Sequence, residues 1–205
     1  MISGLSLPND SSSRLATLLR ALILCLIAGP SAFAADLRPA TFKSILAAIQ
    51  GNPTERVHFK EKRTIRSLKK PLIAEGYLNF LPPDTLIKKI EHPTPIQYAL
   101  SATEIRVTDE VSGEVHSLPN DAIPELSLIR SSLLNLLNGD ESGLSILWNI
   151  SVGGSLQHWH LSLTPRDGVA ANIRMVEFDG QTGNISRMHI VHVDSSEDDL
   201  ILSRP

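Results

Sequence analysis

The sequence is short of cysteine, of aromatic side chains and of any large excess of charge. Cys25 is the only cysteine among 205 residues, and Phe, Trp and Tyr together make up 4% of the chain. One cysteine excludes a disulfide within the chain and a metal site built from several thiolates. Few aromatic residues mean that an apolar interior has to be largely aliphatic. The net charge of −3 argues against a nucleic-acid partner, which usually requires a basic face.

Long apolar runs are also missing, and the longest one lies near the start of the chain. Residues 21–28 are apolar, Gly29-Pro30 ends the run, and Ala32-Phe33-Ala34 supplies the small-x-small pattern that signal peptidases accept. The uncharged stretch 21–35 spans 15 residues, fewer than the roughly 20 that cross a bilayer. We therefore expect residues 1–34 to be a cleaved secretory signal peptide rather than a retained anchor.

The remainder, residues 35–205, is long enough for one domain with its own core. It contains no cysteine, so its stability has to come from packing. No internal repeat or interdomain linker divides it. We expect a single exported domain.

Hydrophobic periodicity predicts both helices and strands in this domain. Apolar residues at helical spacing predict helices over residues 39–50 and 124–138. Short alternating runs between turn residues predict strands. The expected strands cover residues 57–61, 73–80, 85–91, 96–101, 104–109, 114–118, 144–152, 156–164, 172–178 and 185–193. Gly153-Gly154 and residues 179–183 are expected hairpin turns, and the acidic tail from Asp194 is expected to be loose.

The predicted strands favour one antiparallel sheet. Their residues alternate between apolar and polar, which is typical of antiparallel pairing with one solvated face. A sheet of this many strands tends to curl, and the two helices would pack on one side of it. The fold class is therefore α+β, with a strongly curved sheet around the helices. Periodicity alone does not show whether the sheet closes.

Five segments follow one another in a characteristic order and spacing: Val57–Glu61, Pro71–Phe80, Pro82–Leu86, Trp159–Pro165, and the closing hairpin formed by residues 176–180 and 185–188. In this order and spacing they resemble the LolA-like family of periplasmic carriers of outer-membrane lipoproteins. The resemblance spans about residues 37–193.

The resemblance implies an unclosed antiparallel β-barrel, with helices forming a lid over an apolar cavity that takes acyl chains. It also implies transfer between inner- and outer-membrane partner proteins in the periplasm, without chemistry and without a cofactor. One position departs from the family pattern. Carriers of this family place an arginine before the proline of the turn at Pro82, where it latches the lid, but here Leu81 precedes Pro82. The arginine latch is therefore not transferred to this chain. The resemblance leaves three kinds of cargo: a lipid, lipoprotein acyl chains or another apolar envelope compound.

The candidate ligand-binding residues are apolar side chains on the inward strand faces and on one stripe of the helix over residues 124–138. Burial of acyl CH₂ groups against such side chains contributes about 0.8 kcal/mol each. The alternative interpretation is ordinary core packing, which apolar residues of this kind usually serve. The candidates are Val57, Phe59, Leu78, Phe80, Leu86, Leu126, Ile129, Leu133, Leu137, Trp148, Ile150, Trp159, Leu161 and Leu163.

A basic stretch from Lys60 to Lys70 is the candidate contact for a partner protein or a lipid headgroup. Its cations could steer anionic headgroups or an acidic protein surface. The alternative is a solvated loop or strand edge. The candidate contact residues are Lys62, Arg63, Arg66, Lys69 and Lys70.

The histidines and the missing motifs bear on enzyme chemistry. His158 and His160 share a strand face, but a zinc site needs a third ligand, and His189 and His192 are expected on opposite faces. We therefore expect no metal site. No nucleophile elbow, P-loop or dinucleotide-binding motif is present in the sequence.

The first functional hypothesis is accordingly a monomeric periplasmic carrier of an apolar ligand. The second is an envelope protein–protein interaction module with a solid interior and no ligand. A lipid hydrolase is the weakest alternative, because no nucleophile motif supports it.

Overall fold

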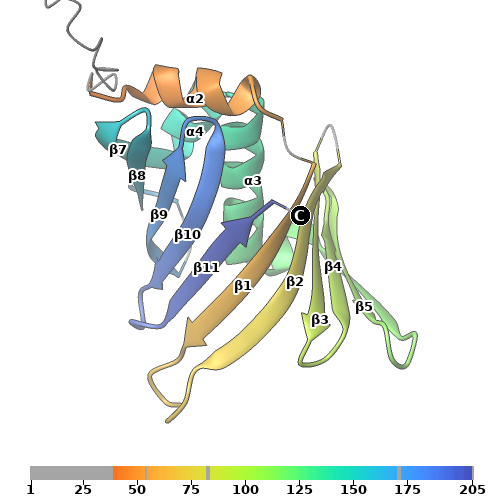
Figure 1. Cartoon of the computed structure of the whole chain (residues 1–205). Coiled ribbons are helices and arrows are strands. Elements are labelled where there is room, and N and C mark those ends of the chain that lie inside the picture. The colour runs from red at the N-terminus through yellow and green to blue at the C-terminus, as the bar shows by residue number, and fades with distance from the viewer. Residues whose placement is uncertain (1–38, 54, 82–83, 170–171, 205) are drawn as a thin grey trace, which may run out of the picture. The chain divides into compact units, whose positions relative to one another are not determined.

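The computed structural model describes residues 39–53, 55–81, 84–169 and 172–204 (Figure 1). The expected signal peptide, residues 1–34, lies outside these ranges. Pro82 and Pro83, of the turn at which the sequence departs from the LolA-like pattern, also lie outside them. The fold described below is that of the remaining residues.

Eleven strands form one antiparallel sheet in the order β6-β5-β4-β3-β2-β1-β11-β10-β9-β8-β7. Among the described residues no pairing joins β6 to β7, so the sheet curls around α3 without closing (Figure 1). This confirms the expected α+β fold with an unclosed, curved sheet. The strands are β1 (Arg56–Thr64), β2 (Leu72–Leu81), β3 (Thr85–His92), β4 (Ile96–Leu100), β5 (Glu104–Asp109), β6 (Val115–Pro119), β7 (Trp148–Ser155), β8 (His158–Pro165), β9 (Ile173–Gln181), β10 (Asn184–His192) and β11 (Glu197–Ser203).

Three α-helices and one short 3-10 helix accompany the sheet in the described ranges: α2 (Phe42–Gln50), η2 (Asn120–Ala122), α3 (Pro124–Asn138) and α4 (Glu141–Leu147). Thr41 and Ser44 cap the start of α2 reciprocally, each hydroxyl accepting the other residue's backbone N–H. Gly139, with φ 66°, ends α3 in the left-handed conformation. None of these helices is long and apolar enough to span a membrane.

The strand expected over residues 144–152 is wrong in its first half. Residues 141–147 form α4, because the Asp140 side chain caps that helix by accepting the Gly143 N–H at 2.9 Å. Strand β7 begins only at Trp148. The glycines at 153 and 154 lie inside β7 rather than in its turn, which falls at residues 156–157.

The expectation of a loose tail is also wrong. Strand β11 lies in the middle of the sheet, paired with β1 on one side and β10 on the other. Its inward residues Asp198, Leu200 and Leu202 are buried. The apolar alternation of this strand is not visible in the sequence because its inward position 198 carries an aspartate. Arg63 and His192 pair with that aspartate in the folded chain.

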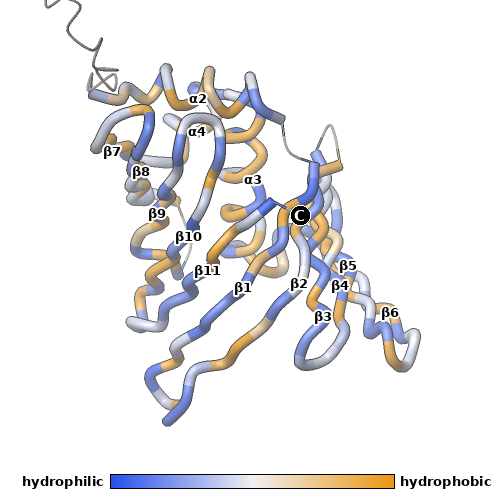
Figure 2. Tube along the Cα trace, viewed as in Figure 1, coloured by the Kyte–Doolittle hydropathy of each residue, from blue (hydrophilic) through white to orange (hydrophobic). Residues whose placement is uncertain are grey.

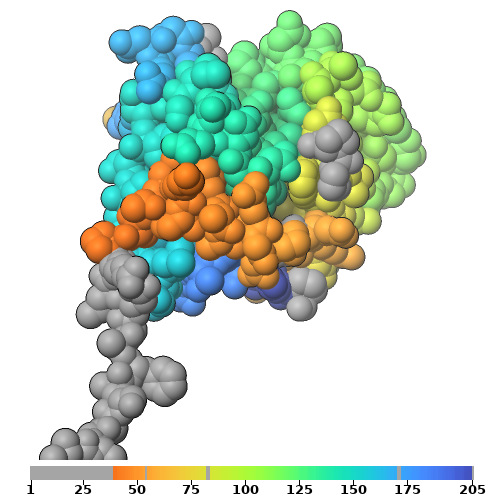
Figure 3. Space-filling model, turned by 90° about the horizontal axis from the view of Figure 1, so that it is seen from above, coloured from red at the N-terminus to blue at the C-terminus, as the bar shows by residue number. Residues whose placement is uncertain are grey.

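Helix α3 packs inside the curve of the sheet, and α2 lies beside it over one end (Figures 1 and 3). A buried hydrogen-bonded chain joins α3 to β7. Trp148 Nε1 donates to Ser132 Oγ at 2.8 Å, and that hydroxyl donates to the Leu128 carbonyl at 2.6 Å. Trp148 and Ser132 are fully buried, so this chain orients α3 at one end of the core.

Replacement of Ser132 by alanine leaves the buried Trp148 N–H without its acceptor. We expect the free energy of unfolding to fall by about 1–3 kcal/mol, measured by urea denaturation. Ser131→Ala on the same helix is the matched control, because Ser131 is only partly buried. An equal, small effect of both substitutions would contradict this role for Ser132.

Candidate functional site

The concave face of the sheet and α3 line two cavities, of about 270 and 1100 Å³. We call them the small cavity and the large cavity. No residue lines both. The larger volume is slightly above, and the smaller slightly below, the range of about 300–1,000 Å³ typical of ligand pockets.

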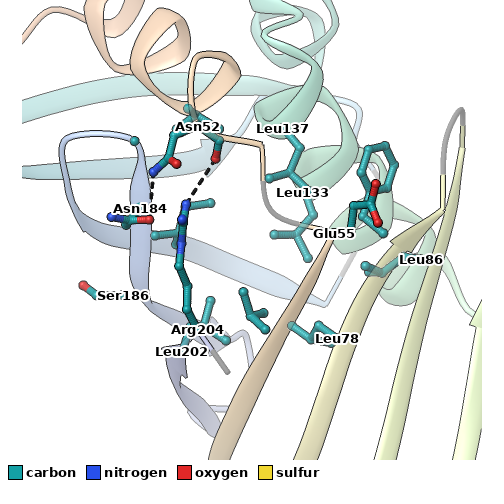
Figure 4. A pocket seen from close by; sticks show the side chains of 15 residues that line it. Asn52, Glu55, Leu78, Leu86, Leu133, Leu137, Asn184, Ser186, Leu202 and Arg204 are labelled. Atoms are coloured by element: carbon teal, nitrogen blue, oxygen red, sulfur yellow. Dashed lines mark hydrogen bonds between the residues drawn. The ribbon is translucent and has the colours of Figure 1, made fainter.

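The small cavity lies between α2, α3 and strands of both halves of the sheet (Figure 4). Asn52 Nδ2 donates to Asn184 Oδ1 at 3.0 Å, and Arg204 Nη2 donates to the Asn52 carbonyl at 3.3 Å. These bonds join the segment after α2 to β10 and to the residue that follows β11. The apolar lining is Ile49, Val57, Leu78, Phe80, Leu86, Leu133, Leu137, Ile185 and Leu202.

The large cavity lies between the first half of α3 and the inner face of β1–β4, and its far wall comes from the adjoining ends of β10 and β11. Aliphatic side chains make up most of its lining, with Tyr98 as the only aromatic residue among those described. The apolar lining is Pro71, Leu72, Ile73, Ala74, Ile90, Pro93, Ile96, Tyr98, Leu100, Ile123, Leu126, Ile129 and Val193.

Ionisable side chains form a polar band in the large cavity, which we define as Glu61, Arg63, Lys88, His192 and Asp198. Lys88 Nζ lies 2.6 Å from Glu61 Oε2. Arg63 Nε lies 3.3 Å from Asp198 Oδ1, and His192 Nε2 lies 2.9 Å from Asp198 Oδ2. Asp198 is only 6% exposed, and a buried carboxylate is costly without partners of this kind. The large cavity therefore has an amphiphilic lining.

Phe59 lies at the boundary between the two cavities. It is fully buried and occupies the inward position of β1 between Val57, which lines the small cavity, and Glu61, which lines the large one. Lys88 Nζ lies 5.1 Å from the centroid of its ring. Phe59 therefore lies in the packed core, between the β1 residues that line one cavity and the other.

The candidate ligand-binding residues fall into three groups. Those that line the small cavity are Val57, Leu78, Phe80, Leu86, Leu133 and Leu137. Those that line the large cavity are Leu126 and Ile129. Neither cavity is lined by Phe59, Trp148, Ile150, Trp159, Leu161 or Leu163. The last group belongs to the core or packs against it, mainly through β7 and β8. A role in ligand binding remains a prediction for the first two groups.

Sequence reasoning missed the polar band, although strand parity could have found part of it. Glu61 has the same parity as Val57 and Phe59, and Lys88 has the same parity as Leu86. A charged residue in an inward register is the signal of a polar site within an apolar face. Asp198 could not be found in this way, because its segment was expected to be a loose tail.

The outward-facing histidines lie apart from both cavities. His160 Nδ1 lies 2.7 Å from Asp179 Oδ1, and His158 is exposed. His189 pairs with Glu177 on the outer face, whereas His192 lines the large cavity. The two histidines therefore lie on opposite faces of β10, as predicted. In the described ranges no group of three or more histidine, cysteine or acidic residues is arranged to hold a metal ion.

The basic stretch divides between the cavity and the surface. Arg63 turns toward Asp198 at the edge of the large cavity. Lys62 on β1, and Arg66, Lys69 and Lys70 in the β1–β2 loop, are exposed. Their role as contacts for a partner or headgroup remains a prediction.

Comparison with known proteins places the chain in a family. Residues 34–198 match the family described as outer membrane lipoprotein carrier protein LolA-like. This chain belongs to the LolA-like family. No curated protein sequence matches it significantly.

Several solved structures share similarity with this LolA-like chain at low identity. A LolA superfamily protein from Nitrosomonas europaea is 12% identical over 80% of this chain and 92% of its own, with a TM-score of 0.41. LprF from Mycobacterium bovis is 14% identical over 79% and 89%, with a TM-score of 0.38. The MucA/MucB complex of Pseudomonas aeruginosa matches at 10% identity over 80% and 56%, with a TM-score of 0.42.

In this LolA-like chain an arginine of α3 contacts the turn between β2 and β3. Arg130 Nη1 donates to the Asp84 carbonyl at 2.8 Å, and the side chain is 8% exposed. Burial lowers the pKa of the Arg130 guanidinium, and the negative charge of Asp84 offsets part of that effect. Leu81 precedes Pro82 in this chain, and Arg130 reaches the same turn from the helix side. It ties α3 to the sheet between the strands that line both cavities.

We expect Arg130→Met to loosen α3, because it removes a charge-assisted hydrogen bond at a buried site. The free energy of unfolding should fall by about 1.5–3 kcal/mol in urea denaturation. Arg174→Met is the control, because Arg174 also donates to a backbone carbonyl, that of Val193 at 3.1 Å, but at an exposed site. Equal losses from the two substitutions would show that Arg130 has no special anchoring role.

Proposed function

We propose that this chain is a periplasmic carrier that binds an acyl or other lipid-like ligand in the large cavity. It would move this ligand between inner- and outer-membrane partner proteins, as a monomer and without chemistry or a cofactor. The observation that carries the proposal is a cavity of about 1100 Å³ with a mostly aliphatic wall, in a chain of the LolA-like family.

The two sides of the large cavity suit two parts of an amphiphile. Acyl CH₂ groups gain about 0.8 kcal/mol each when they leave water for the aliphatic wall formed by β2–β4 and α3. The polar band, which lies on β1, β10 and β11 with Lys88 on β3, supplies ionic partners for a headgroup. Lys88 and Arg63 are the cations there, and they pair with Glu61 and Asp198, while Glu125 and Asp194 also line the cavity. The ligand class supported best is therefore an acyl chain with a polar or zwitterionic head.

The periplasmic location rests on the expected signal peptide together with family membership. The signal segment would direct export, and its removal would leave a chain without cysteine. A diffusing carrier has to leave both membranes, which a cleaved signal permits.

An interaction module without a ligand is the second candidate, and the sheet edge at β6 favours it. Every residue of Val115–Pro119 is exposed, and β6 pairs only with β5 among the described strands. An unpaired edge can accept a strand of a partner protein. Under this alternative the cavities would stay empty of lipid, and binding would depend on β6.

A bulky substitution inside the large cavity separates these functions. Ala74 is a half-buried residue of the cavity wall, and Ala74→Trp would occupy part of the space that an acyl chain needs. We expect the dissociation constant for a fluorescent fatty acid to rise at least tenfold, while the thermal midpoint changes little. Ala99→Trp is the matched control, because Ala99 lies on β4 with the opposite orientation to Tyr98 and Leu100. Fatty-acid binding that is absent in the wild type, or unaffected by Ala74→Trp, would contradict the proposal.

A further inference from the structure

The tip of the β1–β2 hairpin combines exposed apolar side chains with cations. We define the hairpin tip as residues 62–73. Leu68, Leu72 and Ile73 are 47%, 51% and 53% exposed. Figure 1 shows the hairpin extending past the ends of the neighbouring strands, and Figure 2 shows an apolar stretch on its β2 arm next to a hydrophilic loop. Exposed aliphatic side chains gathered on one projecting hairpin indicate a contact surface.

The hairpin tip also carries an uncompensated positive charge. It contains five cations and no acidic residue. Arg63 pairs with Asp198, whereas Lys62, Arg66, Lys69 and Lys70 form no ion pair with any described residue.

The acidic residues of the neighbouring strand do not neutralise these cations. Strand β11 places Glu197, Asp198 and Asp199 opposite the end of β1. Asp199 accepts from Arg187 Nε at 2.6 Å, which raises the pKa of that guanidinium. Glu197 lies 3.5 Å from His189 Nε2, and Asp198 is held by Arg63 and His192. Asp198 and Asp199 are therefore each paired with an arginine, and none of the three carboxylates forms an ion pair with Lys62, Arg66, Lys69 or Lys70, so the hairpin tip stays basic.

The apolar part of the hairpin tip is continuous with the large cavity. Pro71, Leu72 and Ile73 line that cavity, together with Ala74 of the same strand. The same side chains are therefore exposed at the surface and form part of the cavity wall. An acyl chain that left a membrane at this point would meet apolar side chains along its path into the cavity.

We propose that the hairpin tip docks on an anionic lipid surface, with Leu68, Leu72 and Ile73 at the acyl boundary and the four unpaired cations at the phosphates. This inference rests on the proposed carrier function and names its membrane contact. Each cation near an anionic leaflet raises the binding constant about fivefold. A protein partner fits less well, since a stable protein interface takes about 20–30 residues a side and the tip is one hairpin end.

Vesicle flotation of the purified protein tests this proposal. The wild type should bind vesicles of phosphatidylglycerol and phosphatidylethanolamine and should not bind phosphatidylcholine vesicles. Lys69→Glu with Lys70→Glu should weaken binding to the anionic vesicles by at least about twentyfold, because two attractions become repulsions. Leu68→Ser should weaken it by roughly fivefold, and Leu68 does not line either cavity.

Two surface substitutions elsewhere serve as matched controls. Lys43→Glu reverses an exposed cation on α2, and Ile146→Ser removes an apolar side chain that is 73% exposed on α4. Neither should change vesicle binding. The proposal would be overturned if the hairpin and control variants changed vesicle binding equally. It would also be overturned if the lysine reversal left binding to the anionic vesicles unchanged. The proposal would also be overturned if the lysine reversal left vesicle binding intact and instead abolished binding to an inner-membrane protein.

Fatty-acid binding in solution distinguishes this inference from the carrier function itself. The lysine reversal should leave fluorescent fatty-acid binding unchanged, because Lys69 and Lys70 do not line the cavities. Intact fatty-acid binding without any vesicle binding would overturn the docking proposal and leave the carrier function standing. Vesicle binding without fatty-acid binding would contradict the carrier function instead.

Discussion

Helix α3, with α2 over one end and α4 next to β7, has to cover the concave face of a sheet of eleven strands, and the rest of the structure follows from that mismatch. Helix α3 packs closely near β7, where Trp148 bonds to Ser132. It also reaches the β2–β3 turn through Arg130. Between these two points the curled sheet is wider than the helix. Side chains of the inner face therefore line two cavities instead of packing against α3. The cavities are therefore a consequence of the architecture.

The polar band determines what kind of ligand this space suits. Asp198 is buried in a central strand, which is favourable only because Arg63 and His192 hold it. An interior meant only for packing would have an aliphatic residue at this position. The Glu61–Lys88 pair continues the charged strip across β1 and β3. Apolar walls beside ionic groups suit an amphiphile better than a pure hydrocarbon.

The sequence predicts the sheet, the two longer helices and the two faces of most strands, because periodicity reports local burial directly. It fails at β11, where the inward Asp198 breaks the apolar pattern and the acidic neighbours resemble a solvated tail. It also fails at α4, whose seven residues are too few to show a helical period. Most cavity residues of β1–β3 follow from parity, and Ile73 is the exception. Trp148 and Trp159 have the same inward parity, yet they lie in the packed core and line neither cavity. The sequence pattern is the same for a residue that lines a cavity and for one that packs in the core.

The central claim is that the large cavity holds an acyl ligand in the cell. Native mass spectrometry of the protein purified from its own envelope tests this most directly. The account predicts a bound mass that solvent extraction removes and that is identified as an acyl lipid. A protein that carries no lipid, and takes none up when it is offered, would contradict it.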